Sequence, residues 1–226
     1  MGINKSAVKC VKRVALHKMI KTTMNKTIPI LFTLFALAFL TNCGTRKKSA
    51  QSYIEIEQGV LINGVRWATH NVDAPGTFTT NPEDAGMFFQ WNRRKGWNAT
   101  DEEVPNWDYS IDTGTKWYAH NDPCPPGWRV PTQEELYSLQ TNSEKAVKNG
   151  VVGYFFGVAP NRIFLPAVGF RSGTGMLDDV EEGSIIWSNT QYNSEKAVIF
   201  GFDDEYVGVG SFWRSLGLSV RCVAKK

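Results

Sequence analysis

The chain has 226 residues, of which 42% are hydrophobic and 21% are charged, an ordinary composition for a globular protein. The formal net charge of +3 is unevenly distributed, because residues 1–43 hold seven basic and no acidic residues, which leaves 18 basic against 22 acidic residues in 44–226. A mildly acidic domain lacks the basic surface that a polyphosphate backbone requires, so the composition argues against nucleic-acid binding.

An apolar run of 13 residues, 28–40, lies near the start of the chain. It is shorter than the ~20 residues of a membrane-spanning helix, and Lys26 just before it is typical of a signal peptide. Leu40-Thr41-Asn42-Cys43 follows directly and is similar to a lipobox, in which the cysteine takes a lipid. We therefore expect a leader and lipoprotein signal peptide over 1–43 with lipidation at Cys43. The alternative is a plain secretory signal followed by an incidental cysteine.

Other features set the boundaries of this export segment. Met24 would open a compact signal peptide by itself, so it is a candidate for the true start of the chain. Residues 44–52 form a short tether, and residues 53–226 have the size of one domain. The tether is basic, whereas lipoproteins that reach the outer surface often carry acidic residues after the cysteine. We expect a lipid-anchored protein of the outer membrane, with the periplasmic face favoured over the cell surface.

Two cysteines, Cys124 and Cys222, remain after the leader and the lipid site are set aside. An exported domain enters an oxidising compartment, so the two are expected to form a disulfide. The closed loop would span 98 residues, for which chain-entropy models give about 4–5 kcal/mol. The alternative is two separate buried thiols. Neither His70 nor His120 has metal-ligand spacing to these cysteines, so no metal site is expected.

The predicted elements of the domain begin with a β-hairpin at residues 61–68. Its turn is Asn63-Gly64, the strongest short signal for a hairpin. Residues 86–91 (GMFFQW) are typical of a buried strand. Residues 92–126 then form a long polar stretch with several tryptophans and little periodicity. Long segments without regular structure are uncommon, and they are usually functional or packed by their own side chains.

A helix is predicted next, because Thr132 and Glu135 have the spacing of a capping box, in which each side chain bonds the other residue's amide. We expect this helix over 133–141, with an extension to 148 as a second possibility. Many short strands with one or two helices indicate an α+β domain that is mostly antiparallel. The later strands are expected at 152–156, 163–165, 167–170, 185–188, 197–202 and 218–223.

Several motifs of the domain together resemble the FISUMP family, the major paralogous domain of bacterial envelope lipoproteins. The resemblance covers nearly all of residues 60–223. Ile186 departs from it, since an aromatic residue is more usual before Trp187, and Asn189 stands where the family tends to have serine. The motifs are residues 62–68 (INGVRWA), 122–132 (DPCPPGWRVPT), 164–171 (FLPAVGFR), 186–190 (IWSNT), 197–200 (AVIF) and 218–223 (LSVRCV).

The resemblance implies a single C-type-lectin-like domain whose first and last elements lie side by side. Cys124 and Cys222 would then tie the turn before the helix to the final strand. Arg129 and Arg221 lie inside the motifs, and we expect them to be structural. The same superfold contains the formylglycine-generating enzymes, which need a close pair of copper-binding cysteines. The mature domain has no third cysteine and no evident catalytic arrangement, so we expect a non-enzymatic protein without a cofactor.

The candidate ligand-binding residues are Trp91, Trp97, Trp107, Asp108 and Trp117, all near or in the polar stretch. Aromatic faces can stack on sugar rings, and carboxylates can bond hydroxyl groups, so this set suggests binding of a glycan. The competing interpretation is that the tryptophans pack the stretch onto the domain. A second candidate function is a structural or assembly role, in which the protein docks another envelope protein.

Two dense groups of carboxylates occupy the expected turns at 178–182 and 203–205. Such groups can bind calcium, but the spacing matches no calcium-binding loop. Solvated acidic turns are therefore the favoured interpretation, with bound calcium as the alternative.

Overall fold

The computed structural model describes residues 57–226, which contain their own hydrophobic core. The predicted leader, the lipid site at Cys43, the start at Met24 and the tether lie outside the described residues. Within 57–226 no helix is both long and apolar enough to cross a membrane.

The first sheet joins the beginning and the end of the described domain. Its order is β1 (Val60–Ile62), β2 (Val65–Asn71), β14 (Arg221–Ala224) and β5 (Trp128–Arg129), with antiparallel neighbours throughout. The turn between β1 and β2 is the predicted Asn63-Gly64, and both residues have positive φ, 46° and 82°. The predicted hairpin is therefore confirmed, because asparagine and glycine adopt this backbone at little cost.

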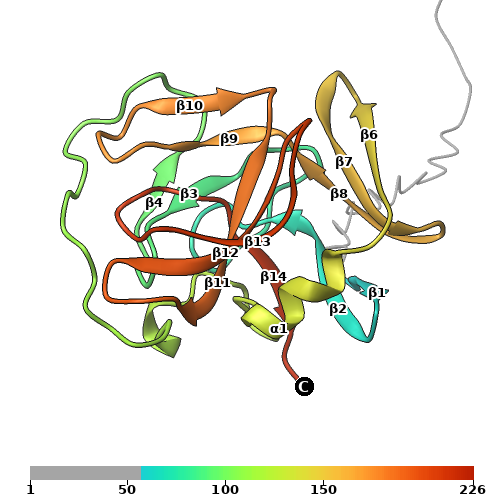
Figure 1. Cartoon of the computed structure of the whole chain (residues 1–226), viewed down its shortest axis with the longest axis horizontal. Helices are drawn as coiled ribbons and strands as arrows, with labels where there is room; N and C mark the ends of the chain where they lie inside the picture. The colour runs from blue at the N-terminus through green and yellow to red at the C-terminus, as the bar shows by residue number, and fades with distance from the viewer. Residues whose placement is uncertain (1–56) are drawn as a thin grey trace, which may run out of the picture. The chain divides into compact units, whose positions relative to one another are not determined.

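The largest sheet has five strands, which are coloured from orange to red in Figure 1. Its order is β10 (Leu177–Val180), β9 (Val168–Arg171), β11 (Ser184–Gln191), β12 (Lys196–Phe202) and β13 (Val207–Trp213). Only β9 and β11 run parallel, and the long β11–β12 and β12–β13 pairs are antiparallel hairpins. Strand β13 lies at the edge and has one strand neighbour.

Two smaller sheets complete the fold. Strands β6 (Ser143–Lys148), β7 (Val151–Val158) and β8 (Asn161–Pro166) form an antiparallel meander. Strands β3 (Met87–Phe89) and β4 (Gly96–Asn98) form a short hairpin at the start of the polar stretch.

Helices are scarce in the described residues, so the expected α+β class is wrong and the domain is mainly β. The one α-helix, α1 (Gln133–Leu136), is continued by a 3-10 turn at Tyr137–Leu139, and a second 3-10 turn covers Ala119–Asn121. The capping box is confirmed, since Thr132 accepts from the amide of Glu135 and the Glu135 carboxylate accepts from the amide of Thr132.

The possible extension of the helix to 148 is contradicted, because residues 143–148 form strand β6. Asn149 and Gly150 follow that strand with positive φ, 50° and 88°, and turn the chain directly into β7. An Asn-Gly turn joins two strands, so hairpin pairing overrides the helical pattern in this segment.

The core lies on both faces of the β11–β12 hairpin. Alternate residues of a strand point to opposite faces. Along β12, Ile199 therefore packs with Trp187 in one apolar cluster, while Phe200 packs with Phe156 in another. Burial on both faces explains why this hairpin is apolar over most of its length, and it fixes the register of the central sheet.

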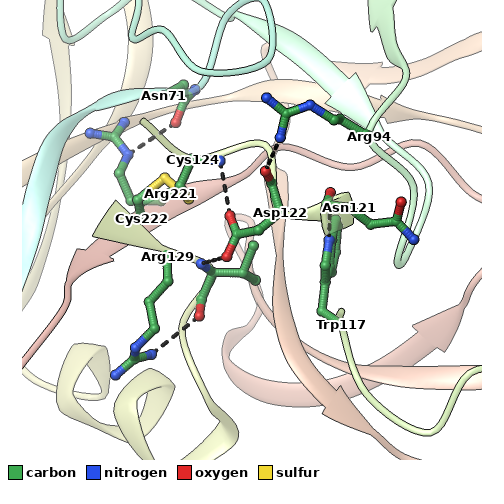
Figure 2. The surroundings of a disulfide bond; sticks show 10 residues. Asn71, Arg94, Trp117, Asn121, Asp122, Cys124, Arg129, Arg221 and Cys222 are labelled. Carbon is green, nitrogen blue, oxygen red and sulfur yellow. Dashed lines mark hydrogen bonds between the residues drawn. A yellow bond between two sulfur atoms is a disulfide. The ribbon is translucent and has the colours of Figure 1, made fainter. Parts of the chain in front are cut away.

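Cys124 and Cys222 are joined by a disulfide, as predicted (Figure 2). The bond connects the turn before α1 to β14, and both residues are buried. Asp122 lies beside it and accepts hydrogen bonds from the amides of Cys124 (2.9 Å) and Val130 (3.2 Å). The bond therefore links two segments that are separated by 98 residues in the sequence.

The two arginines of the motifs are structural, as expected. Arg129 binds both carboxylate oxygens of Glu135 at 2.6 and 2.7 Å. Arg221 is fully buried and donates to the Asn71 side chain and to the backbone carbonyls of Ala68 and Phe164, which connects β14 to β2 and β8. Figure 2 shows the contact between Arg221 and Asn71.

Glu57 gives the domain a predictable loss of stability in acid. Burial opposes its ionisation, but hydrogen bonds to His70, Thr69 and Gly59 outweigh this and lower the pKa of Glu57 from 4.5 to about 2. A carboxyl pKa that is lower in the folded than in the unfolded protein stabilises the fold at pH values above the unfolded pKa. This stabilisation is lost as the pH falls through the folded pKa. Between pH 4.5 and 2 we expect urea unfolding to show a larger loss of stability for the natural chain than for Glu57→Gln. Parallel losses would contradict this role of Glu57.

Candidate functional site

The four tryptophans of the expected glycan surface are buried, with exposed fractions of 0% to 7%. They form two separate pairs. The rings of Trp97 and Trp107 lie 4.8 Å apart between centroids, and those of Trp91 and Trp117 lie 6.2 Å apart. Asp108 remains partly exposed, where its carboxylate accepts from the amide of Ser110. The structure therefore does not bring the predicted residues together as one open surface.

The polar stretch is bound to β11 by the backbone amide of Trp117, which donates to the carbonyl of Asn189 at 3.2 Å, and two indole N–H groups of the set also have carbonyl partners. Trp91 donates to the carbonyl of Ser188, and Trp117 donates to the carbonyl of Asn121, both at 2.9 Å. A sugar ring can stack only on an exposed aromatic face, and these faces are covered by protein. The competing interpretation, in which the tryptophans pack the stretch onto the domain, describes what the structure shows.

A groove of about 740 Å³ lies instead over one face of the five-stranded sheet. Its floor is apolar, with Ile185 of β11 and Ile199 of β12. Phe170 of β9 and Phe212 of β13 stand beside it, with their rings in edge-to-face contact at 5.5 Å between centroids. This volume lies within the range of ligand-binding cavities in proteins.

Glycines keep the floor of this groove open. Gly201 in β12 and Gly210 in β13 line it, and a Cβ at either position would meet nothing closer than 3.5 Å, the nearest atoms belonging to Ile199. Neither glycine has the positive φ that would require its residue type, so larger side chains fit the backbone there. Glycine inside a strand weakens the strand and often marks a place where a ligand or another backbone approaches closely.

Carboxylates from two separate turns form the rim of the groove. Three come from the end of β10 and the turn that follows it, and three come from the turn between β12 and β13. We call the whole site the acidic groove. Its rim carboxylates are Asp179, Glu181, Glu182, Asp203, Asp204 and Glu205.

Most of these rim charges are uncompensated. Among residues 57–226, Asp204 alone of the six has an ion-pair partner, Lys145, and that hydrogen bond lowers its pKa. Desolvation, reinforced by the charges of Asp178, Glu182 and Asp203, raises the pKa of Asp179. The lining includes no lysine, arginine or histidine. The groove therefore combines an apolar floor with a negative potential.

Within residues 57–226 the rim carboxylates are not grouped as metal ligands. The part of the chain from Glu57 onward contains no group of three or more histidine, cysteine, aspartate or glutamate side chains arranged to hold a metal ion. The carboxylate of Asp203 is already engaged, because it accepts from the amides of Glu205 and Tyr206 at 2.7 Å. This arrangement suits hydrogen bonding and charge attraction at the rim of an open groove.

The interpretation of the two acidic segments as solvated turns missed one signal for this groove in the sequence. Residues 207–210 (VGVG) alternate valine with glycine, a pattern that predicts a strand with one bare face. The pairing of Gly210 with Ile199 in the neighbouring strand, which brings two groove residues together, depends on the β12–β13 register. The β11–β12 hairpin separates the two acidic turns in the sequence, and the fold brings both turns to the same groove.

Comparison with known proteins does not place the chain in a family. No family model matches it, and neither the curated proteins nor the solved structures include a significant match.

Proposed function

We propose that this chain is an exported, lipid-anchored and non-catalytic protein of the bacterial outer membrane that docks a protein partner in the acidic groove. The export signal and the similarity to FISUMP lipoproteins support the location. The observation that carries the proposal of docking is the partly exposed apolar surface of Phe170, Ile185 and Phe212 in the groove, beside Gly201 and Gly210, which have no side chain to cover it.

Docking of a protein fits the groove better than binding of a glycan, the other candidate. Glycan binding was expected from tryptophan faces in the polar stretch, and those faces are buried. The groove has the apolar centre and polar rim that are typical of protein interfaces. Tyr206 lies at the rim and is 48% exposed, so a partner in the groove would contact it.

Photo-crosslinking from the groove tests the location of the interface. A photoreactive phenylalanine analogue is placed at Tyr206 or, as a control, at Tyr137, which is equally exposed at 48% but does not line the groove. In intact cells that make the full chain, we expect a defined protein adduct from position 206 and none from 137. The same adduct from both positions, or none from 206, would contradict the proposal.

Filling the floor should abolish docking without unfolding the domain. In the double variant Gly201→Val/Gly210→Val, new side chains occupy the floor of the groove, and valine favours strands more than glycine does. We expect loss of the adduct at position 206 together with an unchanged or higher urea midpoint. Retention of the adduct in a folded variant would show that the partner binds elsewhere.

A glycan array separates the two candidate ligands. The soluble domain 53–226 and its double-valine variant are applied with and without calcium. We expect no specific signal from either. Specific binding that the double-valine variant loses would identify a glycan as the ligand of the groove and would replace the docking proposal.

A further inference from the structure

The charge of the acidic groove restricts what its partner can present. Five of the six rim carboxylates have no ion-pair partner among the described residues, and no basic side chain lines the groove. A partner segment with acidic side chains would be repelled there. A segment with positive side chains would compensate the rim, because complementary potentials favour association and select the partner.

The distribution of that charge also matters. The two acidic turns lie at the rim, while Ile185, Ile199 and Phe212 line the apolar part of the groove. A small polyamine would neutralise the rim but leave the floor in water, and an amino sugar would cover it with hydroxyl groups. A polypeptide can place cationic and apolar side chains on the same segment, so it can satisfy both parts of the site.

The rim carboxylates can accept additional hydrogen bonds from donor groups of a partner. Glu181 and Glu182 are exposed, and neither side chain has a hydrogen-bond partner within 57–226. The mutual repulsion around Asp179, which contributes to its raised pKa, would be relieved by a cation bound between the two turns.

We infer that the segment docked in the acidic groove is a basic polypeptide in which lysine or arginine side chains contact the two acidic turns and apolar side chains cover the floor at Gly201 and Gly210. The inference rests on the proposed function and adds the chemistry of the partner. The requirement for a basic partner can be tested separately from the existence of the docking site, because the floor and the rim of the groove can be mutated independently.

Peptide binding to the soluble domain tests the charge requirement. The probes are short fluorescent peptides in which lysine, glutamine or glutamate alternates with valine, and fluorescence anisotropy gives the dissociation constants. We expect the lysine peptide to bind, its affinity to fall as salt is added, and the glutamine peptide to bind at least about tenfold more weakly. The glutamate peptide should not bind.

Matched variants assign the effect to the rim. Glu181→Gln/Glu182→Gln should weaken binding of the lysine peptide about three- to tenfold, the range for two exposed ion pairs. Glu102→Gln/Glu103→Gln removes the same charge from an exposed adjacent pair outside the groove and should leave binding unchanged.

The outcomes separate this inference from the proposed function. Suppose that the lysine and glutamine peptides bind equally and that the variant Gly201→Val/Gly210→Val binds neither. The groove would then be a docking site, but its selectivity for a basic segment would be overturned. Equal weakening by the rim and control pairs would also overturn the inference, because it would show a general effect of net charge. Failure of the lysine peptide to bind the natural domain would overturn it directly.

Discussion

Replacement of both disulfide cysteines, Cys124→Ala/Cys222→Ala, is expected to lower the free energy of unfolding by about 4–5 kcal/mol. The bond closes a loop of 98 residues that includes most of the described strands, so its loss enlarges the unfolded ensemble considerably. Alanine is the appropriate replacement because Cys222 is completely buried and a serine hydroxyl would need a partner there.

Urea unfolding with and without a reductant measures this contribution. The natural domain should lose stability on reduction, whereas the double-alanine variant should be insensitive to the reductant. Equal urea midpoints for the natural and variant domains under oxidising conditions would contradict a stabilising role for the bond.

The second large effect is expected at Arg214, which joins the polar stretch to the five-stranded sheet. The residue is 1% exposed, and its guanidinium donates to the carbonyls of Asp112 and Gly114 at 2.9 Å and lies 4.2 Å from the centroid of the Trp91 ring. It also donates to the carbonyls of Lys196 and Asn193. Removal of this donor set leaves several partly buried carbonyls without partners.

Arg214→Met should therefore lower the free energy of unfolding by about 3 kcal/mol, because the cost of the unpaired carbonyls exceeds the gain from no longer burying a charge. The near-ultraviolet circular dichroism of the tryptophans should also change, since Trp91 loses its cation contact. Arg162→Met removes an exposed ion pair with Glu144 and should cost less than about 1 kcal/mol. A similar small loss at Arg214 would show that it does not hold the stretch in place.

Local signals in the sequence predicted local structure well. Asn63-Gly64 specified a hairpin, and Thr132 with Glu135 specified the start of a helix, because these turns and caps depend on a few neighbouring residues. The pairing of Cys124 with Cys222 followed from the expected compartment and from the lack of other partners. Each of these predictions required no knowledge of how distant strands are arranged.

The class of the fold and the candidate site depended on such distant arrangements. Residues 143–148 carry a weak helical pattern, but pairing with β7 determines their structure. The tryptophans at 91–117 have the composition of either a binding surface or a packed loop, and only tertiary contacts such as those of Arg214 decide between the two. The acidic groove likewise depends on the β12–β13 register, which aligns Gly210 with Ile199, two residues that line the groove.

The most direct test of the acidic groove as the docking site is an amide NMR titration of the isotope-labelled domain 53–226 with the lysine–valine peptide. We predict that the largest shift changes occur at Gly201, Gly210 and Glu182, with little change at Trp97 and Trp107. Changes centred on the two tryptophans, or an absence of changes at the groove, would contradict the assignment of this face as the binding site.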